Sequence, residues 1–253
     1  MTSNDWDLQG WIEVFKKLKV EVPPVGVRFS INPLDGVKRL SDNIRLCEML
    51  KWAQGGEAFY ADPENHTCTG GLYIMGKNLP YVYTTGEYVA GLQIFNSARA
   101  GRRIYDYIPR LDAERNISYV AFSPLDKLAF VPDLLVILMQ VEQTEILLRA
   151  LSYSTGKMWM SKSTSVIGCA WTYMYPYITG ELNYVVTGLS MGMKAMKLFP
   201  PGWQLISIPN DLFPMMLDNL QKMPLILPLF QPGGDEFRKN LLIKLGLDHS
   251  NHK

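Results

Sequence analysis

Three cysteines and one histidine are the residues of this 253-residue sequence best suited to chemistry: Cys47, Cys68, Cys169 and His66. Cysteine thiolates bind soft metals and iron–sulfur clusters, and a nearby histidine can complete such a site or transfer a proton. Three thiolates from separate segments would leave one iron of a [4Fe-4S] cluster without a protein ligand. The residue types therefore suggest a metal or iron–sulfur centre held by the three cysteines.

The spacing of these residues leaves other interpretations open. No C-x-x-C pair is present and the number of cysteines is odd, so neither a zinc ribbon nor a disulfide framework is indicated. Free cysteines are among the most buried residue types, so the alternative is three small core residues without a metal. His66 is the only histidine outside the C-terminal tail, where His249 and His252 are expected to be mobile. A lone histidine in a loop is more often structural than a ligand.

Two of the cysteines are predicted to lie where a helix begins. Cys68 precedes Thr69-Gly70-Gly71, and Cys169 follows Gly168. A helix N-terminus favours an anion, which predicts a lowered thiol pKa at both positions. The tyrosines near Cys169 are expected either to line a pocket or to pack in the core; they are Tyr173, Tyr175, Tyr177 and Tyr184.

Other motifs are weaker. "GLSMG" (188–192) matches the G-x-S-x-G pattern of hydrolases around Ser190, but only the tail histidines follow it. Neither G-x-G-x-x-G nor a P-loop occurs. Glu142 and Gln143 follow an apolar strand, where ligands gather in open α/β sheets, although a structural helix start explains them as well.

Strand and helix patterns alternate along the chain and position these residues. Strands are predicted at 25–31, 57–61, 117–124, 133–140, 183–189 and 203–209. Helices are predicted at 41–56, 71–76, 142–156, 210–223 and, as a closing C-terminal helix, 233–246. This order predicts an α/β fold, with α+β as the alternative, in a single domain spanning residues 1–253.

The chain also resembles itself at an offset of about 100 residues. "PVGVRFSI" corresponds to "PDLLVILMQ", and Cys68 corresponds to Cys169 after a one-residue slip. A chance match of two similar strand–helix orders is the alternative. The pattern predicts two copies of a strand–helix–strand–Cys–helix unit, residues 20–125 and 126–223, related by a pseudo-twofold axis.

Composition excludes several classes of protein. The net charge is +1, with 47% hydrophobic and 19% charged residues, so no nucleic-acid-binding surface is indicated. The polar start lacks the features of a secretory signal, and the most apolar run, "DLLVILMQV", is far shorter than the roughly 20 residues of a membrane span. The sequence predicts a soluble, cytoplasmic protein that binds neither nucleic acid nor membrane.

Several segments together resemble the DUF169 family of prokaryotic proteins, which is largely uncharacterised and common in anaerobes. They are "PPVGVRF", "RLCEMLKWAQGG", "FYADPENHTCTGGLYIMG", "GCAWTYMYPYITGELNYVVTG" and "ISIPNDLFPMMLDNL", and the resemblance runs from Val20 to about Met223. The family pattern has cysteines at the positions of Cys47, Cys68 and Cys169, which implies a cysteine-based site. The sequence departs from the pattern at "VEQ" and at "TGLSMGMKAM", and the second departure argues against a ligand role for that loop.

The preferred hypothesis is an oxygen-sensitive iron–sulfur protein of an anaerobic prokaryote, with Cys47, Cys68 and Cys169 as ligands. His66 would be a fourth ligand or a proton donor, and an open iron would act on a small-molecule substrate, as an oxidoreductase, or pass electrons to a redox partner. Zinc is the alternative metal. The rival hypotheses are a metal-free small-molecule-binding protein with structural cysteines and an accessory subunit, and a homo-oligomer is compatible with each.

Convergence of the thiols separates these hypotheses. A metal centre requires sulfurs within about 7 Å of one another. A metal-free binding protein predicts a Tyr- and Met-lined cavity with the thiols outside it. An accessory subunit predicts a large exposed apolar patch.

Overall fold

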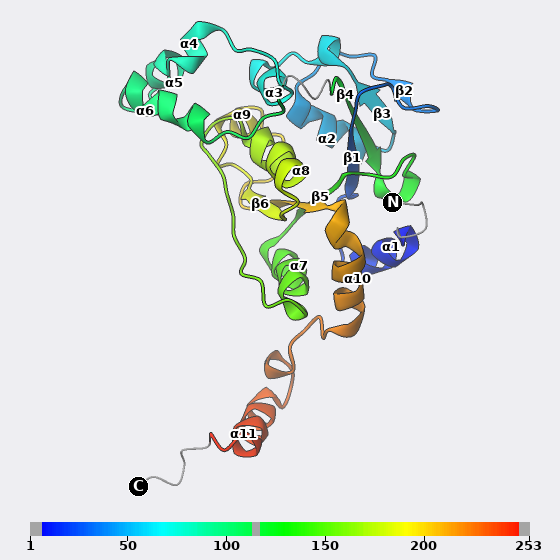
Figure 1. The fold of residues 1–253 in the computed structure, drawn as a ribbon. Coiled ribbons are helices and arrows are strands. Elements are labelled where there is room, and N and C mark those ends of the chain that lie inside the picture. The colour runs from blue at the N-terminus through cyan, green and yellow to red at the C-terminus, as the bar shows by residue number, and fades with distance from the viewer. Residues whose placement is uncertain (1–6, 113–116, 248–253) are drawn as a thin grey trace.

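The computed structural model describes residues 7–112 and 117–247, and its centre is a seven-stranded sheet (Figure 1). The strands are β1 (Val25–Ser30), β2 (Lys38–Arg39), β3 (Phe59–Ala61), β4 (Tyr119–Pro124), β5 (Leu134–Met139), β6 (Asn183–Val186) and β7 (Gln204–Pro209). They lie in the order β2-β3-β4-β1-β5-β7-β6, and every neighbouring pair is antiparallel except β2 with β3. The predicted strands therefore form a mixed α/β domain, which confirms the fold class.

Helices cover both faces of this sheet and enclose two separate cores. On one face lie α2 (Leu46–Gln54), α3 (Thr69–Ile74), a π-helical turn (Ala170–Met174) continued by α8 (Tyr175–Thr179), and α9 (Met191–Ala195). On the other lie α1 (Leu8–Lys17), α7 (Val141–Tyr153) and α10 (Phe213–Lys222). All six residues of β5 are buried, and alternate side chains enter the two cores.

A small helical lobe projects from the first face. It consists of α4 (Tyr81–Thr84), α5 (Glu87–Gly91), α6 (Ala98–Arg103) and a 3-10 turn (Ile104–Asp106) (Figure 1). The backbones of α5 and α6 meet at Gly86 and Gly101. Gly86 has φ +82°, and a Cβ there would lie 2.1 Å from the Ala98 carbonyl oxygen. Only glycine permits this approach.

The chain ends in an arm that extends away from the body (Figure 1). We call residues 224–247 the C-terminal arm; it contains a 3-10 turn (Pro228–Phe230) and α11 (Gly234–Lys244), close to the helix predicted at 233–246. The Arg149 guanidinium donates hydrogen bonds to the carbonyls of Pro224 (2.7 Å) and Leu225 (2.6 Å) and fixes the base of the arm. The predicted tail with His249 and His252 lies outside the described residues.

The antiparallel sheet changes the interpretation of one predicted ligand position. The carboxyl ends of antiparallel strands do not gather at one edge, so the argument that placed a ligand near Glu142 and Gln143 is wrong for this sheet. Gln143 accepts a hydrogen bond from the Gln140 N–H and donates to the Leu18 carbonyl, so it caps α7. No helix among the described residues has the length and apolar character to cross a membrane.

Candidate functional site

Cys47, Cys68 and Cys169 line one cavity of about 380 Å³. Cys47 is the second residue of α2, Cys68 directly precedes α3, and Cys169 directly precedes the π-helical turn. The other lining residues are Arg45, Thr69, Gly70, Leu79, Tyr83, Tyr88, Val89, Tyr105, Val166, Ile167, Gly168, Ser190, Met191, Gly192, Met193, Ala195 and Met196. Thiols from three separate elements therefore share one mostly apolar cavity.

Backbone pairing brings the first two cysteines together. The Ile44 N–H donates to the Asn65 carbonyl (3.0 Å), and the Thr67 N–H donates back to the Ile44 carbonyl (3.2 Å). These bonds join the segment before Cys47 to the segment before Cys68. Gly71 completes the contact, because a Cβ there would lie 3.2 Å from Cβ of Leu46. The starts of α2 and α3 are thus held in close contact.

Cys169 is positioned by the loop that carries Ser190. The Ser190 hydroxyl is buried and accepts a hydrogen bond from the Gly168 N–H (3.2 Å), and a Cβ on Gly168 would lie 2.7 Å from that hydroxyl oxygen. Asn183 donates to the Trp171 carbonyl (2.8 Å) and anchors the π-helical turn to β6. Ser190 therefore contributes to the wall beside Cys169, and His66 is not among the residues lining the cavity. The G-x-S-x-G motif around Ser190 therefore has no histidine beside it among the described residues that line the cavity.

Burial raises the pKa of two of the thiols. The pKa of Cys47 rises to about 12, mainly through burial and then through its neighbour Cys68. Burial, followed by the nearby thiols of Cys47 and Cys68, raises the pKa of Cys169 well above its usual value. The predicted lowering of the Cys169 pKa by a helix N-terminus is wrong, because desolvation outweighs the backbone hydrogen bonds. Both thiols are neutral at pH 7, and a metal would have to displace their protons.

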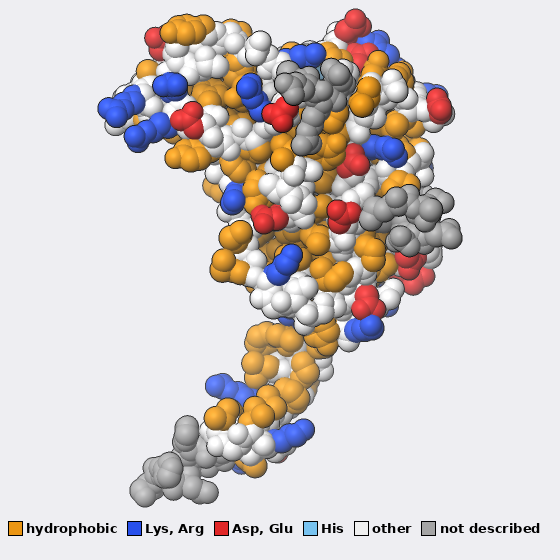
Figure 2. Space-filling view, in the orientation of Figure 1, with side chains coloured by type: hydrophobic (Ala, Val, Ile, Leu, Met, Phe, Trp, Pro, Cys, Tyr) orange, Lys and Arg blue, Asp and Glu red, His pale blue; other side chains and the backbone are white. Residues whose placement is uncertain are grey.

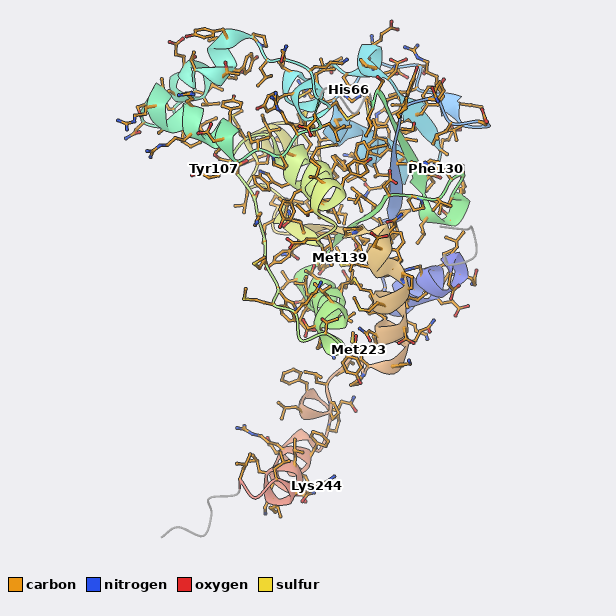
Figure 3. The ribbon with its side chains drawn as sticks, in the orientation of Figure 1. His66, Tyr107, Phe130, Met139, Met223 and Lys244 are labelled. Atoms are coloured by element: carbon orange, nitrogen blue, oxygen red, sulfur yellow. The ribbon has the colours of Figure 1, made fainter. Side chains whose placement is uncertain are left out.

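His66 lies near α3 (Figure 3), and it is not among the residues that line the cavity. It is 7% exposed, and its Nδ1 atom has no hydrogen-bond partner. A Cβ on Gly71 would lie 3.6 Å from this atom. Burial lowers the pKa of His66 to about 4, so the imidazole is neutral at pH 7. Its predicted role as a ligand or proton donor stays a prediction.

Two further segments form cavity walls, and sequence patterns singled out only the one around Ser190. The lobe and the segments flanking it contribute Leu79, Tyr83, Tyr88, Val89 and Tyr105, and α9 and the residue directly after it contribute Met191, Met193 and Met196. The departure from the family pattern at "TGLSMGMKAM" therefore falls on a cavity wall. Burial raises the pKa of Tyr105 to about 12, which keeps this hydroxyl protonated.

The tyrosines expected near Cys169 do not line this cavity. Tyr173 is 1% exposed and packs edge-on against Phe122 in the core. The Tyr175 hydroxyl donates to the Glu181 carboxylate. Tyr173 is therefore a core residue, as the second of the two interpretations predicted.

Within residues 7–112 and 117–247, no group of three or more His, Cys, Asp or Glu side chains is arranged to hold a metal ion. The three cysteines are free thiols. The observed site is therefore a cavity lined by free thiols.

We expect the folded, metal-free protein to be alkylated first at Cys68. At pH 8 the thiolate fraction of a thiol with a pKa of about 12 is about a thousandth of that of a thiol with the ordinary pKa of 9.0. Cys47 should therefore react about 1,000-fold more slowly in the folded protein than in the unfolded chain. Cys169 should be protected similarly, whereas the half-buried Cys68 is accessible. The measurement is a time course of iodoacetamide labelling by peptide mass spectrometry, with urea-unfolded protein as the control. Equal rates at Cys47 in the two states would contradict the burial.

The fold and the site together define a mixed α/β domain with a thiol-lined cavity. The chain belongs to the DUF169 family, which is described as uncharacterised ArCR. The model of this family matches residues 14–219, and this match confirms the resemblance seen in the sequence. The uncharacterized protein MJ0308 of Methanocaldococcus jannaschii is 31% identical over 125 residues. That match covers 48% of this chain and 53% of the relative, so the two correspond over about half their lengths. No solved structure matches the chain.

Proposed function

We propose that Cys47, Cys68 and Cys169 bind an iron–sulfur cluster of the [4Fe-4S] type and that the protein is an oxygen-sensitive oxidoreductase or electron carrier of an anaerobic prokaryote. The observation that carries the proposal is the meeting of three thiols from α2, α3 and the π-helical turn at one cavity. The metal-free hypothesis predicted a Tyr- and Met-lined cavity with the thiols outside it, whereas these thiols are part of the wall. When bound, such a cluster supplies electron transfer and an iron that can act as a Lewis acid.

The three cysteines suit a cluster better than a single metal ion. Each cysteine of a [4Fe-4S] centre binds a different iron, which suits thiols spread around a cavity, whereas a single zinc ion needs every sulfur about 2.3 Å from one point. The cavity of about 380 Å³ leaves room for a small molecule beside the cluster. Arg45 also lines it, and its positive charge would offset the negative charge of three thiolates.

The protein side chains would control what reaches the thiols. Val89 and the tyrosines of the lobe cover one side, and Met193 and Met196 cover another, so much of the cavity wall is apolar. Tyr105 would serve as a hydrogen-bond donor to a bound molecule, because its hydroxyl stays protonated. The lobe would thus act as the selective wall of a site for a small, mainly apolar substrate.

A metal-free small-molecule-binding protein is the second candidate. The raised pKa values of Cys47 and Cys169 favour it, because neutral thiols are compatible with an apolar cavity without any metal. In that case the same walls would bind the ligand and the thiols would be packing residues.

Anaerobic purification followed by iron and acid-labile sulfide analysis tests the proposal. We expect visible charge-transfer absorption with stoichiometric iron and sulfide, lost in Cys68→Ala and Cys169→Ala. Met191→Leu is the matched control, because it changes a cavity residue without removing a thiol. Colourless, iron-free protein after anaerobic reconstitution would reject the cluster and favour the metal-free candidate.

We also propose that the two predicted repeats arose by duplication. β1 and β5 pair antiparallel at the centre of the sheet. The other neighbour of each strand, β4 beside β1 and β7 beside β5, is also antiparallel to it. Val25, the first residue of β1, pairs with Pro124, the last residue of β4. Leu134, the first residue of β5, pairs with Pro209, the last residue of β7. This shared register supports a pseudo-twofold axis between β1 and β5 that relates the strands, whereas α2 and α7, which follow them, lie on opposite faces of the sheet and are not related by it.

The same hydrogen bond recurs in both halves. The Leu125 N–H, directly after β4, donates to the carbonyl of Pro24, directly before β1 (2.8 Å). The Asn210 N–H, directly after β7, donates to the carbonyl of Asp133, directly before β5 (2.9 Å). In this proposal the Cys68 and Cys169 segments are the equivalent parts of the two copies.

A further inference from the structure

The C-terminal arm presents many apolar side chains to solvent. Eight of its large hydrophobic residues are at least 41% exposed: Ile226, Leu229, Phe230, Phe237, Leu241, Ile243, Leu245 and Leu247. Phe230 is 73% exposed, and Gly234 is the one buried residue of α11. Figure 2 shows hydrophobic side chains along the base of the arm and α11. Such an apolar surface on a projecting segment is typical of a segment that binds a partner.

The first residues of the arm, 224–232, direct the arm away from the sheet and its helices. Pro224, Pro228 and Pro232 recur at every fourth residue, and proline fixes φ and stiffens a chain. The hydrogen bonds from Arg149 of α7 hold Pro224 and Leu225, at the base of the arm, against that helix. Met223 lies at the base of the arm and Lys244 near its end, well separated from the sheet (Figure 3). The arm therefore reaches outward rather than folding back.

The body carries an apolar groove of about 240 Å³ that the arm leaves open. It is lined by Leu148, Leu151, Lys157, Met158, Trp159, Met160, Gly180, Glu181, Leu182 and Leu212. Met158 is 76% exposed, and Trp159 and Met160 are 40% and 44% exposed. We call this site the α7 groove, because Leu148 and Leu151 belong to α7. Its mainly apolar lining suits the exposed apolar side chains of the arm.

We propose that the arm of one copy docks in the α7 groove of a second copy, which forms an arm-exchanged dimer. Both unpartnered surfaces belong to the same chain, so one twofold operation buries two arms and fills two grooves. Eight half-exposed large side chains offer on the order of 800 Å² on each copy, which is the contribution of one partner to a standard stable interface. The charged residues of α11, including Arg238 and Lys239, are exposed and can remain in water.

Sedimentation velocity on the full chain and its point variants tests this dimer. We expect twice the chain mass of 28.7 kDa at micromolar concentration. Phe230→Asp in the arm and Met158→Asp in the groove should each weaken the dimer about tenfold or more, because each places a charge in the buried interface. Both side chains are exposed within one copy, so the fold should persist, as circular dichroism would show. Lys239→Gln changes the arm by the same unit of charge and should leave the dimer intact.

A mixing experiment separates arm-in-groove docking from other contacts. An equimolar mixture of Phe230→Asp and Met158→Asp retains one intact arm and one intact groove, so dimer should partly return. A monomeric wild-type chain would overturn the proposal. A dimer insensitive to Met158→Asp would also overturn it, because the two arms would then pack on each other or elsewhere.

Discussion

Gly86→Ala is expected to unfold the lobe and to open the thiol cavity. A Cβ at Gly86 would lie 2.1 Å from the Ala98 carbonyl oxygen and 2.3 Å from the Arg102 nitrogen. These are backbone atoms, so a side-chain rotation cannot relieve the clash. The positive φ adds strain for any residue other than glycine. Together the two effects should cost about 3 kcal/mol or more of local stability.

The consequence should reach the thiols, because the lobe forms one wall of the cavity. Amide hydrogen exchange should rise across residues 81–106, and Cys68 should be alkylated faster than in the wild type. Gly91→Ala is the matched control: it lies in α5 and a Cβ there meets no atom within 4 Å. It should leave exchange unchanged or slow it slightly. If both variants behaved alike, the close contact of α5 with α6 would not determine the order of the lobe.

The second large effect is a pH dependence of stability that comes from His66. Burial lowers its pKa from 6.5 to about 4. Between these pH values the unfolded chain binds a proton at this residue and the folded chain does not. Stability is therefore fully present above pH 6.5 and falls as the pH decreases toward 4. The loss from this residue should amount to about 3 kcal/mol.

Urea unfolding of the wild type and His66→Gln at pH values from 4 to 7 measures this effect. Asp62, whose pKa is lowered by its hydrogen bond with Arg39, also loses native interactions near the acid end of this range. Because Asp62 is present in both proteins, the difference between their free energies of unfolding isolates His66. That difference should shrink or reverse in favour of the variant at low pH. A constant difference would mean that the folded imidazole takes up a proton as readily as the unfolded one.

Much of the sheet could be predicted from sequence, because its long strands are rich in apolar residues. β4, β5 and β7 are six residues long and almost entirely buried, so hydrophobicity alone marks them. Their directions could not be predicted this way. A run such as "LLVILM" fits a parallel or an antiparallel sheet, since both bury a central strand on two faces.

The lobe could not be predicted for a different reason. Its helices α4, α5 and α6 have four to six residues, which is less than two turns, so no apolar period can develop. Their packing depends on the approach of Gly86 to Gly101, a contact between residues that no local pattern relates. For this reason the sequence could not identify Tyr83 and Tyr88 of the lobe as residues of the cavity.

The cysteines were identifiable by residue type, whereas their electrostatics were not. A helix start beside Cys169 suggested a lowered pKa, but the sign depends on how deeply the thiol is buried, which is a tertiary property. His66 illustrates the same limit. Its position two residues before Cys68 suggested a shared site, yet with extended backbone at His66 and Cys68 the imidazole lies against Gly71 of α3 and outside the cavity lining.

β5 makes the two cores of the protein thermodynamically interdependent. Leu134, Val136 and Leu138 enter the core beneath the thiol cavity, whereas the intervening residues enter the core formed with α1, α7 and α10. Neither core can lose its packing while the other keeps an intact β5, so the two are expected to melt in one cooperative transition. Any ligand that binds the cavity would then raise the melting temperature of the opposite layer, which it never touches.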